Sequence, residues 1–150
     1  MALRDEFTAS LKEAMKAGDK LKVSTLRLIT SALKDRDIEA RGAGKTLTDD
    51  DIFALLQKMV KQRQESLKIY QDAGRSDLAE QEQGEISIIQ SYLPQQMEES
   101  EVSSAIDSVI AEIGAASIKD MGKVMAALKE RFAGRMDFGA ASGVIKAKLS

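Results

Sequence analysis

The side chains that could do chemistry in this chain are hydroxyls, amines and carboxylates, because its 150 residues include no histidine, no cysteine and no tryptophan. Without these residues there is no thiolate nucleophile, no Ser-His-Asp triad, no zinc site built from His and Cys, and no iron–sulfur cluster. Absent cysteine also means absent disulfides. The composition therefore excludes several large classes of hydrolytic, redox and metal-dependent sites.

Two short motifs resemble parts of known active sites. Ser31 and Lys34 have the Ser-x-x-Lys spacing in which a lysine lies one helical turn from a serine nucleophile, but the companion motifs Ser-Asp-Asn and Lys-Thr-Gly are missing. The segment 44–46 reads Gly-Lys-Thr, like the end of a phosphate-binding loop, yet Glu39 stands where that loop needs a glycine. We interpret them as a solvated helix face and a helix end with its turn, and predict no catalytic residue.

Acidic residues before and after the turn at Gly74 could in principle hold a divalent cation through their carboxylates; they are Asp72, Asp77, Glu80, Glu82 and Glu85. Their spacing is not that of a calcium loop, which favours ion pairs with nearby cations, among them Lys61, Lys68 and Arg75. We predict that Arg63 forms a structural ion pair with Glu82 or Glu85, costly to break singly if it is buried. No metal and no cofactor are predicted.

Charge is distributed unevenly although the net charge is only −2. Residues 75–112 contain one basic and nine acidic residues, whereas residues 113–150 contain seven basic and three acidic residues. Such a cluster of cations could contact the phosphates of a nucleic acid, although a merely solvated basic face is the alternative. The candidate RNA-binding residues are Lys119, Lys123, Lys129, Arg135, Lys146 and Lys148.

Apolar residues recur at intervals of three and four along the whole chain, which predicts an all-α protein. Thr48 and Asp51 have the spacing of a capping box, and Asp19 and Asp137 precede other apolar stripes as expected of N-caps. Seven helices are expected: the first from 3 to 17, and the others beginning after Asp19, at Thr48, at Ser76, at Ser100 or a neighbour, at Ser117 and at Asp137.

The only proline, Pro94, disfavours helix at the residue before it and is the strongest candidate for a domain boundary. We predict an N-terminal four-helix domain over residues 1–93, a linker over 94–99, and a C-terminal three-helix domain over 100–150. The sequence has no uncharged apolar run of about 18 residues and no signal-peptide pattern at its start. It therefore predicts a cytoplasmic protein with no membrane contact.

Several motifs in the same order resemble those of the GatB/YqeY family, and together they cover nearly the whole chain. They are Leu26-Arg27-Leu28-Ile29, Lys61-Gln62-Arg63, Tyr70-x-x-Ala73-Gly74-Arg75, Tyr92-Leu93-Pro94, Asp120-Met121-Gly122-Lys123 and Gly134-Arg135-x-Asp137. The chain departs from the family pattern at Met136, where a small residue is expected, and in the segment 138–141, where a more polar helix is expected.

The resemblance implies a C-terminal domain of the GatB/YqeY tail type, similar to the tail of the GatB component of the glutamine-dependent aspartyl/glutamyl-tRNA amidotransferase, a carbon–nitrogen ligase. In that enzyme the tail contacts tRNA, while the chemistry lies elsewhere. This sequence has neither a recognisable glutaminase nucleophile nor an ATP and Mg²⁺ site. We therefore expect a tRNA-associating module that is not catalytic alone. The alternative is a helical accessory protein that docks on an amidotransferase or another translation component.

Overall fold

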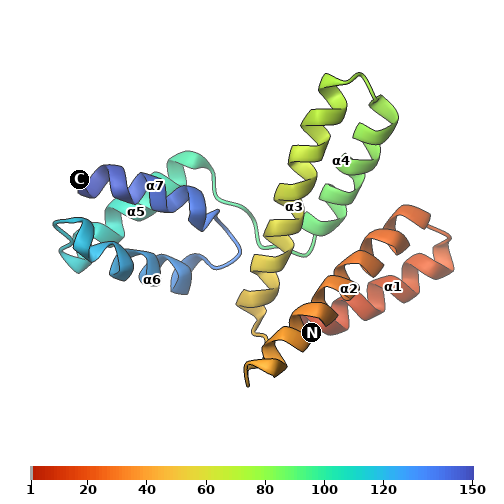
Figure 1. Cartoon of the computed structure of the whole chain (residues 1–150), viewed down its shortest axis with the longest axis horizontal. Coiled ribbons are helices and arrows are strands. Elements are labelled where there is room, and N and C mark those ends of the chain that lie inside the picture. Colours follow the sequence, from red (N-terminus) through yellow and green to blue (C-terminus); the bar gives the residue numbers. More distant parts are fainter. Residues whose placement is uncertain (1) are drawn as a thin grey trace. The chain divides into compact units, whose positions relative to one another are not determined.

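The computed structural model, which describes residues 2–150, confirms that the chain is all-α (Figure 1). It contains α1 (Leu3–Ala17), α2 (Lys20–Gly42), α3 (Asp49–Asp72), α4 (Ser76–Gln90), α5 (Glu99–Ile113), the 3-10 turn η1 (Ile118–Asp120), α6 (Met121–Phe132) and α7 (Phe138–Leu149). The helices fall into two compact units that meet in the sequence between Leu93 and Pro94. We call the part before this point unit 1 and the part after it unit 2.

Unit 1 consists of two helical hairpins, α1–α2 and α3–α4 (Figure 1). The first hairpin turns at Gly18, whose φ of 69° lies in the left-handed region that favours glycine, and Asp19 then caps α2 by accepting the Lys22 N–H. The hairpins approach closely where Gly84 of α4 faces Leu21 of α2. A Cβ atom at Gly84 would lie 2.6 Å from Leu21 Cδ2, so the absence of a side chain permits this packing.

The capping box predicted at the start of α3 is confirmed. The Thr48 hydroxyl accepts the Asp51 N–H at 3.2 Å, and the Asp51 carboxylate accepts the Thr48 N–H at 2.9 Å. The Thr48 hydroxyl also donates to the Asp51 carboxylate at 3.0 Å, and the two hydrogen bonds that this carboxylate accepts from Thr48 lower the pKa of Asp51. Three aspartates in the first turn also favour this helix end, because its N-terminus carries partial positive charge.

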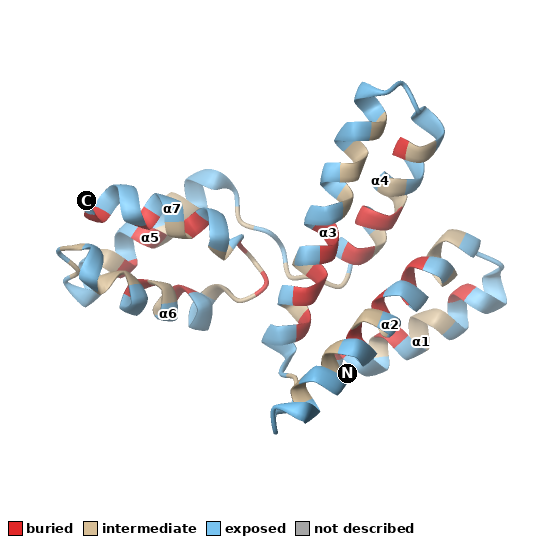
Figure 2. Cartoon of the chain, in the orientation of Figure 1, coloured by how far each residue is buried: buried red, intermediate tan, exposed pale blue. Residues whose placement is uncertain are grey.

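The core of unit 1 is mainly aliphatic, as the low aromatic content of 4% predicts, with Phe7 as its buried aromatic residue. Leu26, Ile29, Leu56 and Ile89 are completely buried, and they come from three of the four helices. Figure 2 shows the buried residues on the parts of α2, α3 and α4 that pack together, whereas the far end of the α3–α4 hairpin is mostly exposed. This second hairpin therefore extends beyond the core that anchors it.

Unit 2 has a separate core made by α5, α6 and α7. Ile106, Val124, Leu128 and Ile145 are completely buried there. Met136, the residue that departs from the family pattern, is 2% exposed and packs in the same core. The larger side chain is thus accommodated inside unit 2.

Helix α5 begins at Glu99, a neighbour of Ser100, and Glu98 and Glu101 form a capping box at its N-terminus. One helix start in unit 2 differs from the sequence-based expectation. Helix α6 begins at Met121, since residues 118–120 form a 3-10 turn instead of a first α-helical turn. The Asp120 carboxylate accepts the Ala116 N–H at 3.0 Å and stabilises this tighter turn.

The segment expected to be a linker makes specific hydrogen bonds within unit 2. Gln96 donates to the Gly134 carbonyl, the Met97 N–H donates to the Arg135 carbonyl at 2.9 Å, and Arg135 Nε donates to the Gln95 carbonyl at 3.0 Å. These contacts attach the residues before α5 to the loop between α6 and α7.

Candidate functional site

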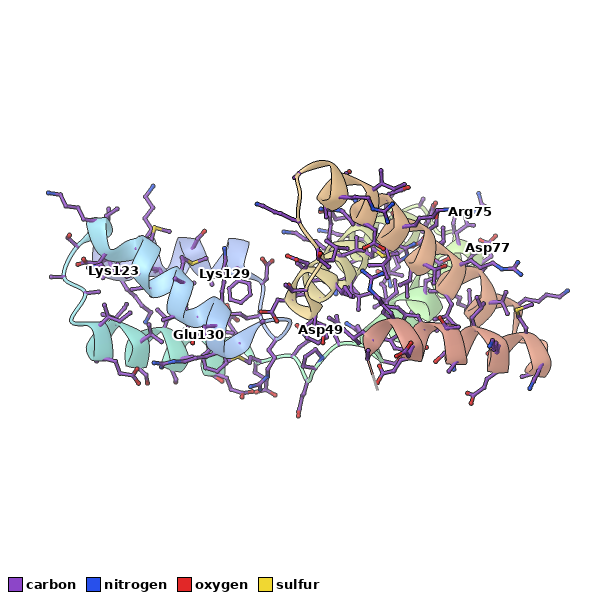
Figure 3. All side chains as sticks on the ribbon, turned by 90° about the horizontal axis from the view of Figure 1, so that it is seen from below. Asp49, Arg75, Asp77, Lys123, Lys129 and Glu130 are labelled. Carbon is purple, nitrogen blue, oxygen red and sulfur yellow. The ribbon has the colours of Figure 1, made fainter. Side chains whose placement is uncertain are left out.

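All six candidate RNA-binding cations lie in unit 2, on the last two helices and the turns that precede them. Helices α6 and α7 bury Val124, Leu128, Ala141 and Ile145 against α5, so their other faces carry the basic side chains. Figure 3 locates two of these lysines on α6. The helical periodicity of the sequence therefore places the cations on the surface.

Two of the six cations have structural partners. Lys148 Nζ pairs with Asp107 Oδ1 at 2.7 Å and so links α7 to α5. Arg135 donates to the Gln95 carbonyl, and its guanidinium lies 6.0 Å from the centre of the Phe132 ring. These contacts give Lys148 and Arg135 a role in holding unit 2 together, which the sequence could not distinguish from phosphate binding.

The remaining four lysines, Lys119, Lys123, Lys129 and Lys146, are exposed, and within residues 2–150 none of them forms an ion pair. We call them the four-lysine set. Unit 2 as a whole is not basic, since residues 94–150 contain seven basic and eight acidic residues. Four of these charges neutralise one another in the pairs Arg131–Glu112 and Lys148–Asp107.

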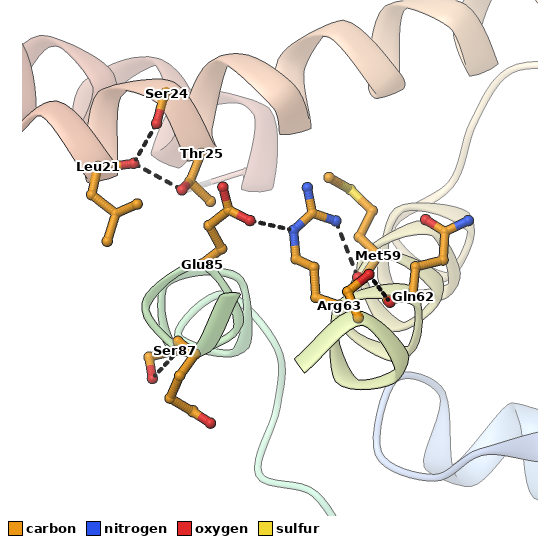
Figure 4. Close-up of polar contacts among 10 residues, drawn as sticks. Leu21, Ser24, Thr25, Met59, Gln62, Arg63, Glu85 and Ser87 are labelled. Atoms are coloured by element: carbon orange, nitrogen blue, oxygen red, sulfur yellow. Dashed lines mark hydrogen bonds and ion pairs between the residues drawn. The ribbon is translucent and has the colours of Figure 1, made fainter. Parts of the chain in front are cut away.

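An ion pair in unit 1 joins Arg63 of α3 to Glu85 of α4, with 3.1 Å between Nε and Oε2 (Figure 4). Arg63 Nη1 also donates to the Met59 carbonyl at 3.1 Å. The two side chains are only 15% and 9% exposed. Of the two acids that the sequence left open, Glu85 is thus the one that accepts from Arg63.

Glu82, one helical turn before Glu85, lacks this hydrogen bond. Burial and the negative charge of Glu85 raise the pKa of Glu82, and the nearby Arg63 offsets these effects only in part. Because its folded-state pKa is raised, the charged form of Glu82 destabilises the fold above that pKa, and this penalty disappears as the pH falls through it.

The variant Glu82→Gln is therefore expected to be slightly more stable than the original chain at pH 7, because glutamine carries no charge to desolvate. Urea unfolding followed by circular dichroism should show this gain shrinking as the pH is lowered through the range in which Glu82 binds its proton. A gain that is the same at pH 3.5 and at pH 7 would contradict this assignment of the cause.

The other sequence motifs lie in ordinary structural positions. Helix α2 ends at Gly42, and the Lys45 N–H donates to the Ala40 carbonyl, so the Gly-Lys-Thr segment is a helix end and turn. Ser31 and Lys34 are both exposed on α2. Asp77 pairs with Arg75 at 3.3 Å. In the part of the chain that the structure describes, no three acidic side chains come together as a metal site would require.

Sequence reasoning missed a groove in unit 1, because its walls come from distant parts of the chain. The groove has a volume of about 800 Å³ and lies where the end of α1 and the first turns of α2 face α4. Its lining includes Met15, Lys20, Val23, Arg27, Leu28 and Glu85. Met15 and Leu28 in this lining are large apolar residues that remain exposed in the structure.

Comparison with known proteins gives a match over almost the whole chain. A family model described as Yqey-like protein matches residues 4–149. Relatives named "Altered inheritance of mitochondria protein 41, mitochondrial" are 35% identical over 105 residues in Lachancea thermotolerans, 36% over 83 residues in Vanderwaltozyma polyspora and 32% over 129 residues in Pyrenophora tritici-repentis.

These matches cover 69%, 55% and 82% of this chain, and 55%, 44% and 69% of the respective relatives. The chain thus spans about half the length of the first two. Within residues 2–150, no helix is both long enough and apolar enough to cross a membrane.

Proposed function

Because the chain belongs to the Yqey-like protein family, with a family match over residues 4–149, we propose that it is a tRNA-associating module and not a catalyst on its own. The observation that carries this proposal is the four-lysine set, which leaves four exposed cations on η1, α6 and α7 without ion-pair partners in the described chain. Cations in this state are available to the phosphates of a nucleic acid.

The proposed contact is with the RNA backbone and not with base edges. The two aromatic residues near the lysines, Phe132 and Phe138, pack against the core of unit 2 and are not exposed platforms for stacking. Lysine acts as a point charge toward phosphate and carries little sequence information. The binding is therefore expected to be of moderate strength, tolerant of sequence and sensitive to salt.

The relation to amidotransferases belongs to the same proposal. The sequence resembles the tail of the GatB component of a carbon–nitrogen ligase that uses glutamine, and a tail of this type would supply RNA contacts while another protein performs the chemistry. The second candidate function, an accessory protein that docks on an amidotransferase or another translation component, is favoured by the apolar groove in unit 1.

The compartment remains a prediction. The sequence predicts a cytoplasmic protein, whereas the relatives are described by name as mitochondrial. The proposed contact is the same in either place, because both compartments contain tRNA.

The test is a titration of the full chain with tRNA at several salt concentrations. Four phosphate contacts predict that the affinity falls roughly 50- to 150-fold between 50 and 200 mM salt. A protein of similar size and net charge without a basic cluster is the control. An affinity no higher than that of the control, or one that salt does not weaken, would contradict the proposal.

A further inference from the structure

The groove in unit 1 has a regular wall. Along α2 its lining residues are Lys20, Val23, Ser24, Arg27 and Leu28, which follow the spacing of a single helix face. Met15 lines it from α1, and Gln81 and Glu85 line it from α4. The α2 wall from Lys20 to Leu28 is about 12 Å long, which corresponds to slightly more than two turns of a helix lying along it.

The groove exposes apolar surface that a folded protein usually buries. Met15 is 54% exposed and Leu28 is 45% exposed, and Val23 between them is partly buried. Single exposed apolar residues are ordinary, but here two large ones line the same groove with Val23 and give it an apolar surface. The groove contains no aromatic side chain, so it does not offer the stacking surface that single-stranded nucleic acid uses.

The charge of the groove indicates the chemistry of that partner. Lys20 and Arg27 line it, and neither forms an ion pair with any residue that the structure describes. The carboxylate in the lining, Glu85, is already paired with Arg63. The groove therefore presents two cations that form no ion pair in the described chain, beside apolar side chains.

We propose that this groove binds an acidic amphipathic helix of a partner protein. Apolar side chains spaced i, i+3 or i+4, and i+7 on that helix would contact Met15, Val23 and Leu28, while its carboxylates would pair with Lys20 and Arg27. This inference does not rest on the proposed tRNA contact, because the groove lies in unit 1 and the four-lysine set lies in unit 2. Either proposal can fail without the other.

The experiment uses two synthetic helical peptides with leucines at the same i, i+3 and i+7 positions and either glutamates or lysines on the flanks. Each is added to the full chain labelled with ¹⁵N, and amide chemical shifts report both the affinity and the site. The acidic peptide is expected to shift the amides of residues 15–28 and 81–85, and to bind about tenfold more tightly than the basic peptide.

Two variants and one control test the residues. Lys20→Glu combined with Arg27→Glu is expected to reverse the preference between the peptides. The control is Lys34→Glu combined with Lys68→Glu, which makes the same charge change at exposed positions outside the groove. It should leave the preference for the acidic peptide unchanged. Leu28→Ser replaces an exposed apolar side chain without changing the charge. It is expected to lower the affinity for the acidic peptide at least about tenfold.

The proposal would be overturned if the two peptides bound with equal affinity. It would also be overturned if the acidic peptide changed the chemical shifts of amides elsewhere and not those that line the groove. Groove amides that shift when the protein alone is concentrated would instead identify a second copy of this chain as the occupant. Groove amides that shift with tRNA alone would identify nucleic acid as the occupant, and either result would overturn it as well.

Discussion

Arg63→Ala and Glu85→Ala are each expected to lower the free energy of unfolding by about 3 kcal/mol. Each variant leaves the opposite charge in a site where the Arg63 and Glu85 side chains are only 15% and 9% exposed. Loss of Arg63 also leaves the Met59 carbonyl without the hydrogen bond that the guanidinium donates. Urea unfolding at pH 7, monitored by circular dichroism, measures the change directly.

The double variant Arg63→Met with Glu85→Leu distinguishes the cost of an unpaired charge from the value of the pair. It is expected to recover most of the stability, because apolar side chains of similar size remove both charges together. The exposed pair Arg75–Asp77, whose side chains are 58% and 66% exposed, is the control, and Asp77→Ala should cost far less stability than Arg63→Ala or Glu85→Ala. Single variants as stable as the original chain would contradict the burial of the pair.

Leu128→Ala is expected to destabilise unit 2 by about 2–5 kcal/mol, because it leaves a cavity beside the completely buried Ile106, Val124 and Ile145. We propose that units 1 and 2 are domains that unfold separately, since each has its own core. Amide hydrogen exchange should therefore accelerate in residues 99–149 and remain unchanged in residues 3–92.

Leu26→Ala is the matched variant in unit 1, because Leu26 is also completely buried. It is expected to produce the opposite pattern, with faster exchange in residues 3–92 only. If either variant accelerated exchange throughout the chain, the two units would unfold as one cooperative structure, and the proposed division into domains would be wrong.

The helices could be predicted because their signals are local. Thr48, Asp19 and Asp137 cap α3, α2 and α7 through hydrogen bonds that span only two or three residues, so the sequence pattern contains the whole interaction. The predicted start of the sixth helix at Ser117 is wrong for a related reason. The Asp120 carboxylate accepts a hydrogen bond from the N–H of Ala116, four residues earlier, and this contact favours a 3-10 turn. The spacing of apolar residues alone cannot distinguish such a turn from an α-helix.

The candidate sites depended on contacts between helices, which the sequence alone does not contain. Glu82 and Glu85 lie three positions apart on α4, so both were reasonable partners for Arg63, and only the packing of α3 on α4 selects Glu85. Lys148 was grouped with the exposed lysines because its partner Asp107 is 41 residues away. The groove joins Met15 to Glu85 across most of unit 1, so no motif could reveal it.

The proposed function is tested most directly by the tRNA affinity of a variant in which Lys119, Lys123, Lys129 and Lys146 are all replaced by glutamine. At 50 mM salt this variant is expected to bind about 100-fold more weakly than the original chain, with the salt dependence largely lost. A matched variant replaces four exposed unit 1 lysines in the same way: Lys12, Lys34, Lys58 and Lys68. It should bind as the original chain does, and equal losses in the two variants would contradict the assignment of tRNA contact to unit 2.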